Sequence, residues 1–216
     1  SFLLLAIRDA REQHRWKLVR SIAPLVEQAA LQVDSRVGLA EAKLNMLEVS
    51  LAEHSFVDAG IQLEELSQFQ TMNQQVMARL AVLRAEFLIS QKNWVEANQE
   101  LQSAQKIFRN LLDLQGLARA FMRQGYLLFL LSRLESAVDR FSQAMQLSSK
   151  DSLDWAESQA RLIELRLRLG WTDGLAKQIE QFWKTTQARS NVHHMAYAAY
   201  SSGIFLLSQG RQEEGI

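Results

Sequence analysis

Arginine and tyrosine are the chemistry-bearing residues that gather in this 216-residue sequence. Seven arginines fall between residues 119 and 168, and the three tyrosines are Tyr126, Tyr197 and Tyr200. Both residue types are the ones most often found as anchors in protein interfaces. The pattern therefore favours recognition of a partner over catalysis.

Catalytic and metal-binding patterns are not found. The sequence has no G-x-S-x-G, no phosphate-binding glycine loop and no H-E-x-x-H. His193 and His194 are adjacent, so on a helix they point about 100° apart and do not share one metal ion. We predict a non-catalytic protein with no metal site and no cofactor.

Composition narrows the classes of partner. Lys plus Arg and Asp plus Glu are both 24, and a nucleic-acid binder usually has a basic excess, so we expect no direct nucleic-acid partner. The apolar run at residues 1–7 is too short to span a bilayer. The absence of cysteine fits a reducing compartment, and we predict a cytoplasmic location.

Six short turns indicate which secondary-structure elements position these residues. They fall at almost even steps of 40, 38, 40, 38 and 40 residues, at His14, His54, Lys92, Ser132, Gly170 and Gly210. With one proline and nine glycines in the whole chain, the segments between the turns have few helix breakers. A repeat of this length built only from helices predicts a stacked solenoid.

Apolar and small residues keep a fixed register to these turns. Positions five, nine and twelve after a turn share one helical face, as do positions seven and three before it. Each unit is therefore predicted to be an antiparallel helix pair whose two apolar stripes are covered only by stacking. The predicted helices are 2–12, 16–31, 35–53, 56–70, 73–91, 94–112, 115–131, 134–148, 152–169, 173–187 and 191–208.

Local signals refine these helices. Asp34, Asn73, Asp151 and Asn191 are candidate N-caps, because their side chains accept hydrogen bonds from free backbone N–H groups. Pro24 lies inside a predicted helix, where we expect it to bend the helix or to start a new one.

One stretch carries a family resemblance. It combines a small residue in the first helix, an apolar residue after the turn, an alanine, an aromatic residue and a second alanine, at Gly125, Leu134, Ala137, Phe141 and Ala144. This pattern resembles the tetratricopeptide repeat, whose usual length is 34 residues. The longer period here, about 39 residues, is similar to that of bacterial regulators of the maltose-activator type.

The resemblance implies an all-α, right-handed superhelical solenoid of about five antiparallel helix pairs. We expect residues 1–216 to form a single solenoid that is a fragment of a longer protein. Its expected units are 1–33, 34–72, 73–112, 113–150, 151–189 and a partial 190–216. The ends cut through the repeat, so self-association through apolar stripes at Phe2–Leu5 and Ile204–Leu207 is expected.

The resemblance also implies where a partner binds. In such repeats the first helix of each pair lines the concave face, and the same register selects the residues of that face. The candidate binding residues are Arg79, Glu86, Arg119, Met122, Arg123, Tyr126, Arg161, Glu164, Tyr197 and Tyr200. The Lys and Asn that hold a C-terminal carboxylate in chaperone-binding members are replaced here, as by Leu44, Val82 and Met122, so that function is not expected.

The predicted function is a non-catalytic scaffold module that binds a protein or peptide inside a larger regulatory or assembly protein. The alternative is an effector-sensing regulatory domain that controls an attached output domain, such as that of a transcriptional regulator.

Overall fold

The computed structural model describes residues 2–69, 73–188 and 192–211, and this part of the chain contains α-helices and no strand. Its eleven helices are α1 (Phe2–Glu12), α2 (Trp16–Gln32), α3 (Arg36–Ala52), α4 (Phe56–Ser67), α5 (Gln74–Ser90), α6 (Trp94–Asn110), α7 (Leu114–Leu130), α8 (Leu134–Leu147), α9 (Leu153–Arg168), α10 (Leu175–Gln187) and α11 (Val192–Ser208). The all-α prediction is confirmed, and each predicted helix starts within two residues of an observed one. The predicted starts and ends at residues 70 and 191 lie outside the described residues.

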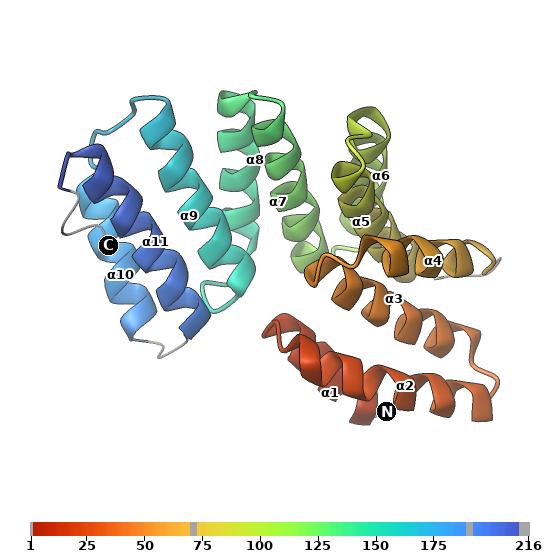
Figure 1. Ribbon diagram of the computed structural model, residues 1–216. Coiled ribbons are helices and arrows are strands. Elements are labelled where there is room, and N and C mark those ends of the chain that lie inside the picture. Colours follow the sequence, from red (N-terminus) through yellow and green to blue (C-terminus); the bar gives the residue numbers. More distant parts are fainter. Residues whose placement is uncertain (1, 70–72, 189–191, 212–216) are drawn as a thin grey trace. The chain divides into compact units, whose positions relative to one another are not determined.

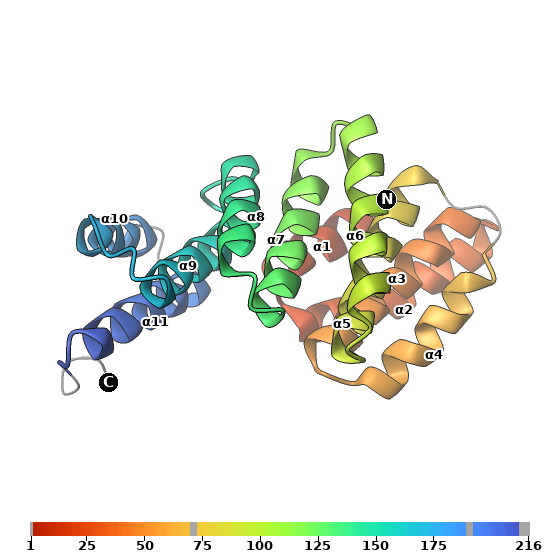
Figure 2. The same cartoon turned by 90° about the horizontal axis from the view of Figure 1, so that it is seen from above.

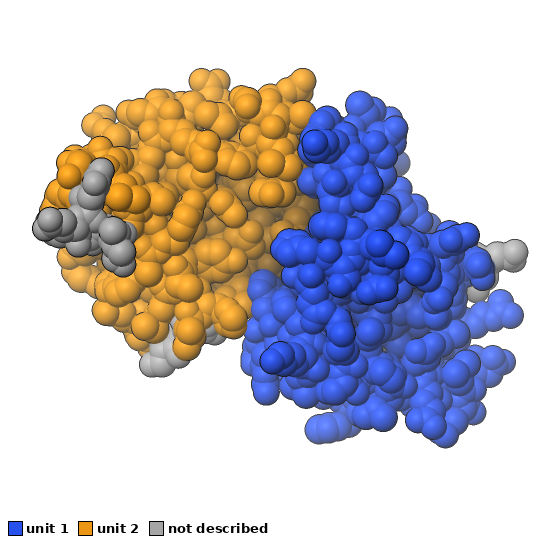
Figure 3. All heavy atoms as spheres, in the orientation of Figure 1, with its two compact units in different colours: residues 1–120 blue, residues 121–216 orange. Residues whose placement is uncertain are grey.

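Two compact units divide the chain, residues 1–120 and residues 121–216 (Figure 3). The boundary falls inside α7, whose first turn belongs to unit 1. In unit 1, α1 packs on α2, α2 on α3, α3 on α4, and α5 on α6 (Figures 1 and 2). In unit 2, α8 packs on α9 and α10 on α11. Neighbouring helices therefore pack in pairs, as in a helical repeat.

The six predicted turns share one backbone geometry. His14, His54, Lys92, Ser132, Gly170 and Gly210 all have a positive φ, between 52° and 74°. At each of them the next backbone N–H donates to a carbonyl five residues earlier, for example Asn93 to Leu88 at 2.9 Å. This is the Schellman arrangement that ends a helix with a left-handed residue. The turns recur in the sequence because every pair closes with the same cap.

The links between pairs add a side-chain cap at the start of the following helix. Ser35, Asn73, Asp113 and Ser152 precede α3, α5, α7 and α9, and each side chain accepts a hydrogen bond from the backbone N–H three residues later. The prediction of Asn73 as an N-cap is confirmed.

Two other predicted caps are wrong by one residue. Ser35 caps α3, because Asp34 takes the left-handed position that ends the preceding helix, with φ 49°. Ser152 caps α9 in place of Asp151. Asn191 lies outside the described residues.

Pro24 neither ends α2 nor starts a new helix. The helix continues from Trp16 to Gln32 through this proline, whose side chain is exposed. Of the two predicted alternatives, a new helix start is therefore wrong, whereas a bend of α2 stays a prediction.

Three apolar cores have the same construction: a second helix lies between two first helices. One core joins α2 to α1 and α3 through Val19, Ile7 and Val49. The others place α4 between α3 and α5, and α10 between α9 and α11. The position five residues after a turn is fully buried in every described pair, at Val19, Ala59, Ala97, Ala137 and Leu175.

A first helix thus buries two faces, one toward each flanking second helix. On α3, Ala42 and Val49 face α2, whereas Leu44 and Leu47 join the core with α4. What remains of α3 includes a strip of polar residues that contains Glu41 and Glu48. Within the described residues, no helix is long and apolar enough to cross a membrane.

Candidate functional site

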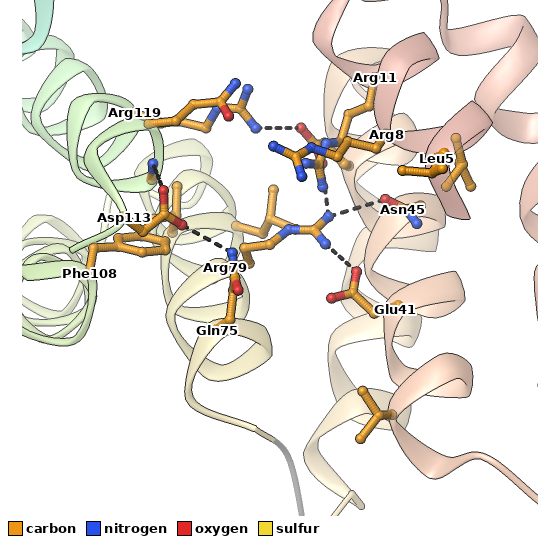
Figure 4. A pocket seen from close by; sticks show the side chains of 17 residues that line it. Leu5, Arg8, Arg11, Glu41, Asn45, Gln75, Arg79, Phe108, Asp113 and Arg119 are labelled. Carbon is orange, nitrogen blue, oxygen red and sulfur yellow. Dashed lines mark hydrogen bonds and ion pairs between the residues drawn. The ribbon is translucent and has the colours of Figure 1, made fainter. Parts of the chain in front are cut away.

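A cavity of about 400 Å³ opens in unit 1 (Figure 4). It is lined by the first helices α1, α3, α5 and α7 together with Phe108 at the end of α6 and Asp113 in the turn that follows. We call it the unit-1 cavity, and its lining residues are Leu5, Ile7, Arg8, Arg11, Val37, Glu41, Asn45, Glu48, Gln75, Arg79, Val82, Leu83, Phe108, Asp113, Gln115, Gly116 and Arg119. The polar strips of successive first helices therefore meet at one place.

Glu48 is the centre of an ion-pair network in this cavity. Its Oε1 lies 3.2 Å from an Nη atom of Arg119, and its Oε2 lies 3.5 Å from an Nη atom of Arg79. The same Oε2 is 3.7 Å from Nε of Arg11. Three helices other than its own thus bring a guanidinium to one carboxylate.

Arg79 is also held by α3. It pairs with Glu41 and donates to Oδ1 of Asn45 at 3.1 Å. On the other side of the cavity Gln75 donates to Oδ2 of Asp113, while Oδ1 of Asp113 caps α7 at Gly116. Figure 4 shows the labelled side chains of Arg8, Arg11, Arg79 and Arg119 converging on the same space.

The surroundings of Arg11 in this cavity disfavour its positive charge. Burial lowers its pKa to about 10, and the positive charge of Arg79 acts in the same direction, while Glu48 opposes the shift. Its Nε is buried and makes no hydrogen bond. The pKa of Arg11 is thus the net result of its burial and of the charged side chains around it in the cavity.

One wall of the cavity is formed where Gly116 of α7 packs closely against the ring of Phe108. A Cβ atom at this position would lie 2.3 Å from Cε1 of Phe108, far inside ordinary contact distance. Glycine therefore lets the first turn of α7 approach the ring of Phe108, whose side chain is buried.

Unit 2 contains a second polar group, which we call the Glu164 cluster: Arg161, Glu164, Arg168 and Tyr200. Oε2 of Glu164 accepts hydrogen bonds from Arg161 at 2.9 Å and from the Tyr200 hydroxyl at 3.1 Å. Oε1 accepts from Arg168, whose guanidinium also lies 4.8 Å from the Phe129 ring centroid. This network joins α9 to α11 and reaches α7 through an aromatic contact.

Two tyrosines of unit 2 have raised pKa values. Burial is the main cause for Tyr197, and the negative charge of Glu157 adds to it, while Arg123 and Arg161 oppose the shift. Burial also raises the pKa of Tyr200, together with Glu164. Like any tyrosine, both phenols are protonated at neutral pH, and they donate hydrogen bonds to carboxylates, Tyr197 to Glu157 and Tyr200 to Glu164.

The predicted binding residues fall into two groups. The unit-1 cavity contains Arg79 and Arg119. Unit 2 brings together Arg161, Glu164 and Tyr200, and it places Tyr197 close enough to Arg123 and Arg161 for their charges to act on it.

The other three predicted residues lie as follows. Glu86 is half-buried on α5 and does not line the unit-1 cavity. Met122 is buried, with 2% of its surface exposed. Tyr126 stacks at 6.5 Å on Phe129, the ring that Arg168 covers.

Arg11, Asn45 and Phe108 were not among the predicted binding residues. The sequence contains a signal for Arg11, because it stands three residues before a turn, where Leu51, Ile89, Phe129, Leu167 and Leu207 are apolar. A charged residue at a position that is apolar in the other repeats indicates that this part of the helix does not pack in an apolar core, and Arg11 lines the cavity. No comparable signal identifies Phe108, which comes from a second helix.

Three comparisons with known proteins bear on the fold. No protein-family model matches the chain, and no curated protein matches it. One similar solved structure is the crystal structure of BtubC (BKLC) from P. vanneervenii, with a TM-score of 0.67 and 14% sequence identity. The alignment covers 100% of this chain and 87% of that chain. At this identity the likeness concerns the fold alone.

Among the described residues, no three His, Cys, Asp or Glu side chains lie close enough together to hold a metal ion.

Proposed function

We propose that this chain is a tetratricopeptide-like solenoid that acts as a non-catalytic module for binding a protein or peptide, through the polar strips of its first helices. The observation that carries the proposal is the unit-1 cavity, because four first helices contribute to it in the order of the chain. The recurrence of one turn geometry at 38- and 40-residue steps supports the repeat assignment. The absence of cysteine agrees with a reducing compartment, so a cytoplasmic location belongs to the proposal.

Binding at the cavity is tested by blocking it without changing its charge. A library of random peptides is selected for binding to the full chain, and the selected peptides are measured by fluorescence anisotropy. Gln115 lines the cavity and is exposed, so Gln115→Trp places a bulky ring at its edge with little cost to folding. We expect the selected peptides to lose affinity for this variant.

Gln74→Trp is the matched control. Gln74 is an exposed glutamine in the first turn of α5, as Gln115 is in the first turn of α7, but it does not line the cavity. Peptides that bind both variants as tightly as they bind the unchanged chain would rule out the cavity as the binding site.

The volume of the cavity favours effector sensing as a second candidate function. About 400 Å³ lies within the range of small-molecule sites, roughly 300–1,000 Å³. A thermal-shift screen of small metabolite-like compounds against the full chain tests this candidate. A ligand that raises the melting temperature of the unchanged chain but not of Gln115→Trp would support it, and no shift with any compound would count against it.

Self-association remains a separate part of the proposal. Phe2 and Leu5 are exposed at 83% and 68%, and Leu207 at 47%. Sedimentation of the full chain with Phe2→Ser and Leu207→Ser tests it: a concentration-dependent dimer that both changes leave intact would exclude these residues.

A further inference from the structure

One face of α11 in unit 2 has the residue register that the other first helices bury. Four positions of a first helix lie 14, 10, 7 and 3 residues before its turn and share one helical face. In α3 and in α9 all four residues belong to the core that the helix forms with the second helix of its own pair. In α3 they are Ala40, Leu44, Leu47 and Leu51. The corresponding residues of α11 are Ala196, Tyr200, Gly203 and Leu207, which we call the α11 stripe.

The α11 stripe is reached by solvent, unlike its counterparts. Tyr200 is 43% exposed and Leu207 is 47% exposed, whereas the matching residues of α3 are buried. Ala196 is also exposed, while the alanine at the same position is buried in α3, α5, α7 and α9. The opposite side of α11, with Ala198 and Phe205, packs in the core with α9 and α10 (Figure 1). The stripe is therefore a helix face whose residue pattern is that of a core but whose side chains meet water.

The composition of α11 favours a protein contact on this face. The helix contains no Asp, Glu, Lys or Arg, although a helix with one face in water usually carries charged residues there. Val192 and Ala199 lie beside the stripe and are exposed as well. An exposed apolar surface of this kind is typical of a binding site for another protein.

Gly203 indicates which side chain the stripe accepts. Among the first helices only α7 has another glycine at this position, Gly125. A Cβ atom on Gly125 would lie 3.0 Å from Cδ2 of Phe141 in α8, so the missing side chain lets the phenylalanine ring lie against the backbone of α7. Phe141 is buried there. By the same register, Gly203 offers a notch for an aromatic ring on α11.

We propose that the α11 stripe binds an amphipathic helix of a partner protein, which places a phenylalanine over Gly203. The expected pattern of that helix is the one α8 presents to α7, with Ala137, Phe141 and Ala144 all buried. Anchors spaced by four and three residues are the usual way in which a helix binds in an apolar groove. The proposal goes beyond the proposed function, because the α11 stripe shares no residue with the unit-1 cavity.

A partner helix is a better occupant than a helix of a second copy of this chain. The complement of the stripe is a second helix, and a copy would have to supply one of its own. The position five residues after the turn is already buried in each of its described second helices, α2, α4, α6, α8 and α10. A copy would therefore have to unpack a helix to offer it.

The probe is a capped, fluorescein-labelled peptide that copies residues 133–148 of this chain and so contains the sequence of α8. Its control is the same peptide with alanine in place of Phe141. Anisotropy titrations use the full chain. We expect the phenylalanine peptide to bind at least about tenfold more tightly than the alanine peptide, because a buried aromatic anchor commonly contributes that much. Isolated helices of this length are marginal in water, so circular dichroism should show a gain of helix on binding. Binding without that gain would overturn the proposal.

Gly203→Leu provides the sharper test, because it fills the notch. Leucine is accommodated at the same position of α3, as Leu47, so we expect the variant to fold. It should weaken the phenylalanine peptide about tenfold through overpacking and weaken the alanine peptide less, since only the ring needs the space. Equal effects on the two peptides, or no effect on either, would contradict the assignment of the notch. If circular dichroism shows that this variant does not fold, Gly203→Ala, with Ala85 as its counterpart in α5, is expected to act in the same direction.

Leu207→Ser removes an apolar side chain from the stripe and is expected to weaken the phenylalanine peptide about tenfold. Leu130→Ser is the matched control. Leu130 also lies in the last turn of a first helix of unit 2 and is similarly exposed, at 41%, but it does not belong to the register of the stripe. Its loss is expected to leave the affinity unchanged. Equal weakening by both variants would overturn the proposal, because the peptide would then bind any exposed leucine.

The remaining outcomes separate this proposal from the proposed function. Gln115→Trp blocks the unit-1 cavity and is expected to leave the binding of the phenylalanine peptide unchanged, and a loss of binding would place the peptide in the cavity instead. If library peptides bind Gln115→Trp normally while Gly203→Leu still weakens the phenylalanine peptide, the proposed function falls and the α11 site stands. No binding of either peptide to the full chain would show that the stripe does not accept a separate helix. A dimer of the full chain that Gly203→Leu dissociates, without peptide binding, would assign the stripe to a second copy and overturn the proposal.

Discussion

Gly116→Ala tests whether the contact between α7 and Phe108 shapes the unit-1 cavity. The new Cβ would lie 2.3 Å from Cε1, 2.5 Å from Cδ1 and 2.7 Å from Cζ of Phe108. Ordinary carbon contacts are about 3.5–4.0 Å, so the ring or the first turn of α7 must move by roughly 1 Å. Phe108 is 1% exposed and lines the cavity, so this movement changes both packing and the cavity wall.

The expected cost follows from two opposing terms. Overpacking of a buried site costs about 1–3 kcal/mol. Replacing glycine by alanine in a helix interior gains up to about 1 kcal/mol, and less here because Gly116 lies in the first turn of α7. We expect a net destabilisation of about 1–2 kcal/mol, or a fall in melting temperature of about 2–8 °C.

Gly60→Ala is the control for this prediction. Gly60 lies inside α4, and its added Cβ would be 3.5 Å from Cζ of Phe87, an ordinary contact. We therefore expect this variant to be stabilised by about 1 kcal/mol. Thermal and urea unfolding followed by circular dichroism compares the two variants with the unchanged chain. If Gly116→Ala is stabilised as much as Gly60→Ala, the contact does not constrain the fold and the reasoning is refuted.

Three further predictions concern the turns, the caps and the tyrosines. Leu112 has φ 56° and is 82% exposed, so we expect Leu112→Gly to stabilise the chain by about 1 kcal/mol. Gly170 has φ 73° with open space where a Cβ would lie, so we expect Gly170→Ala to destabilise the chain by a similar amount. Urea unfolding measures both changes in the free energy of unfolding. Asn73→Ala removes the side chain that caps α5 and should cost about 1 kcal/mol, while Asn73→Ser should keep most of the stability in the same assay. Because the raised pKa of Tyr197 keeps its phenol protonated in the fold, its stabilising contribution is complete below the ordinary tyrosine pKa of 10.0 and is lost as pH rises from there toward the folded pKa. Unfolding measured across this alkaline range should therefore show a smaller loss in Tyr197→Phe than in the unchanged chain, and an identical loss in both would contradict the role of its burial.

Local chemistry explains why so much of the helix pattern is predictable. A left-handed residue ends each first helix, and the hydrogen bonds that close the turn involve only residues within five positions of one another. The buried positions follow from the same register, since Ala59, Ala97 and Ala137 are all fully buried five residues after a turn. Where adjacent residues compete for one role, as Asp34 and Ser35 do at the start of α3, the sequence does not decide between them.

The candidate site is only partly predictable. The register placed Arg79 and Arg119 on the predicted concave face of the first helices, and both line the unit-1 cavity. It did not reveal that they share Glu48, because Arg119 and Glu48 are 71 residues apart. Such a meeting depends on the angle between helices and on the side-chain rotamers, which no local pattern encodes.

The sequence by itself determined the helices, their turns and the buried face of each helix, because each follows from the conformational preference of a few neighbouring residues and from a period of 3.6. Tertiary structure alone decided which polar residues meet. In unit 1 it placed Arg11, Arg79 and Arg119 around Glu48, and in unit 2 it brought Tyr200 of α11 to Glu164 of α9. These contacts join different helices, so they exist only once the helices are packed and most of the water is excluded from between them.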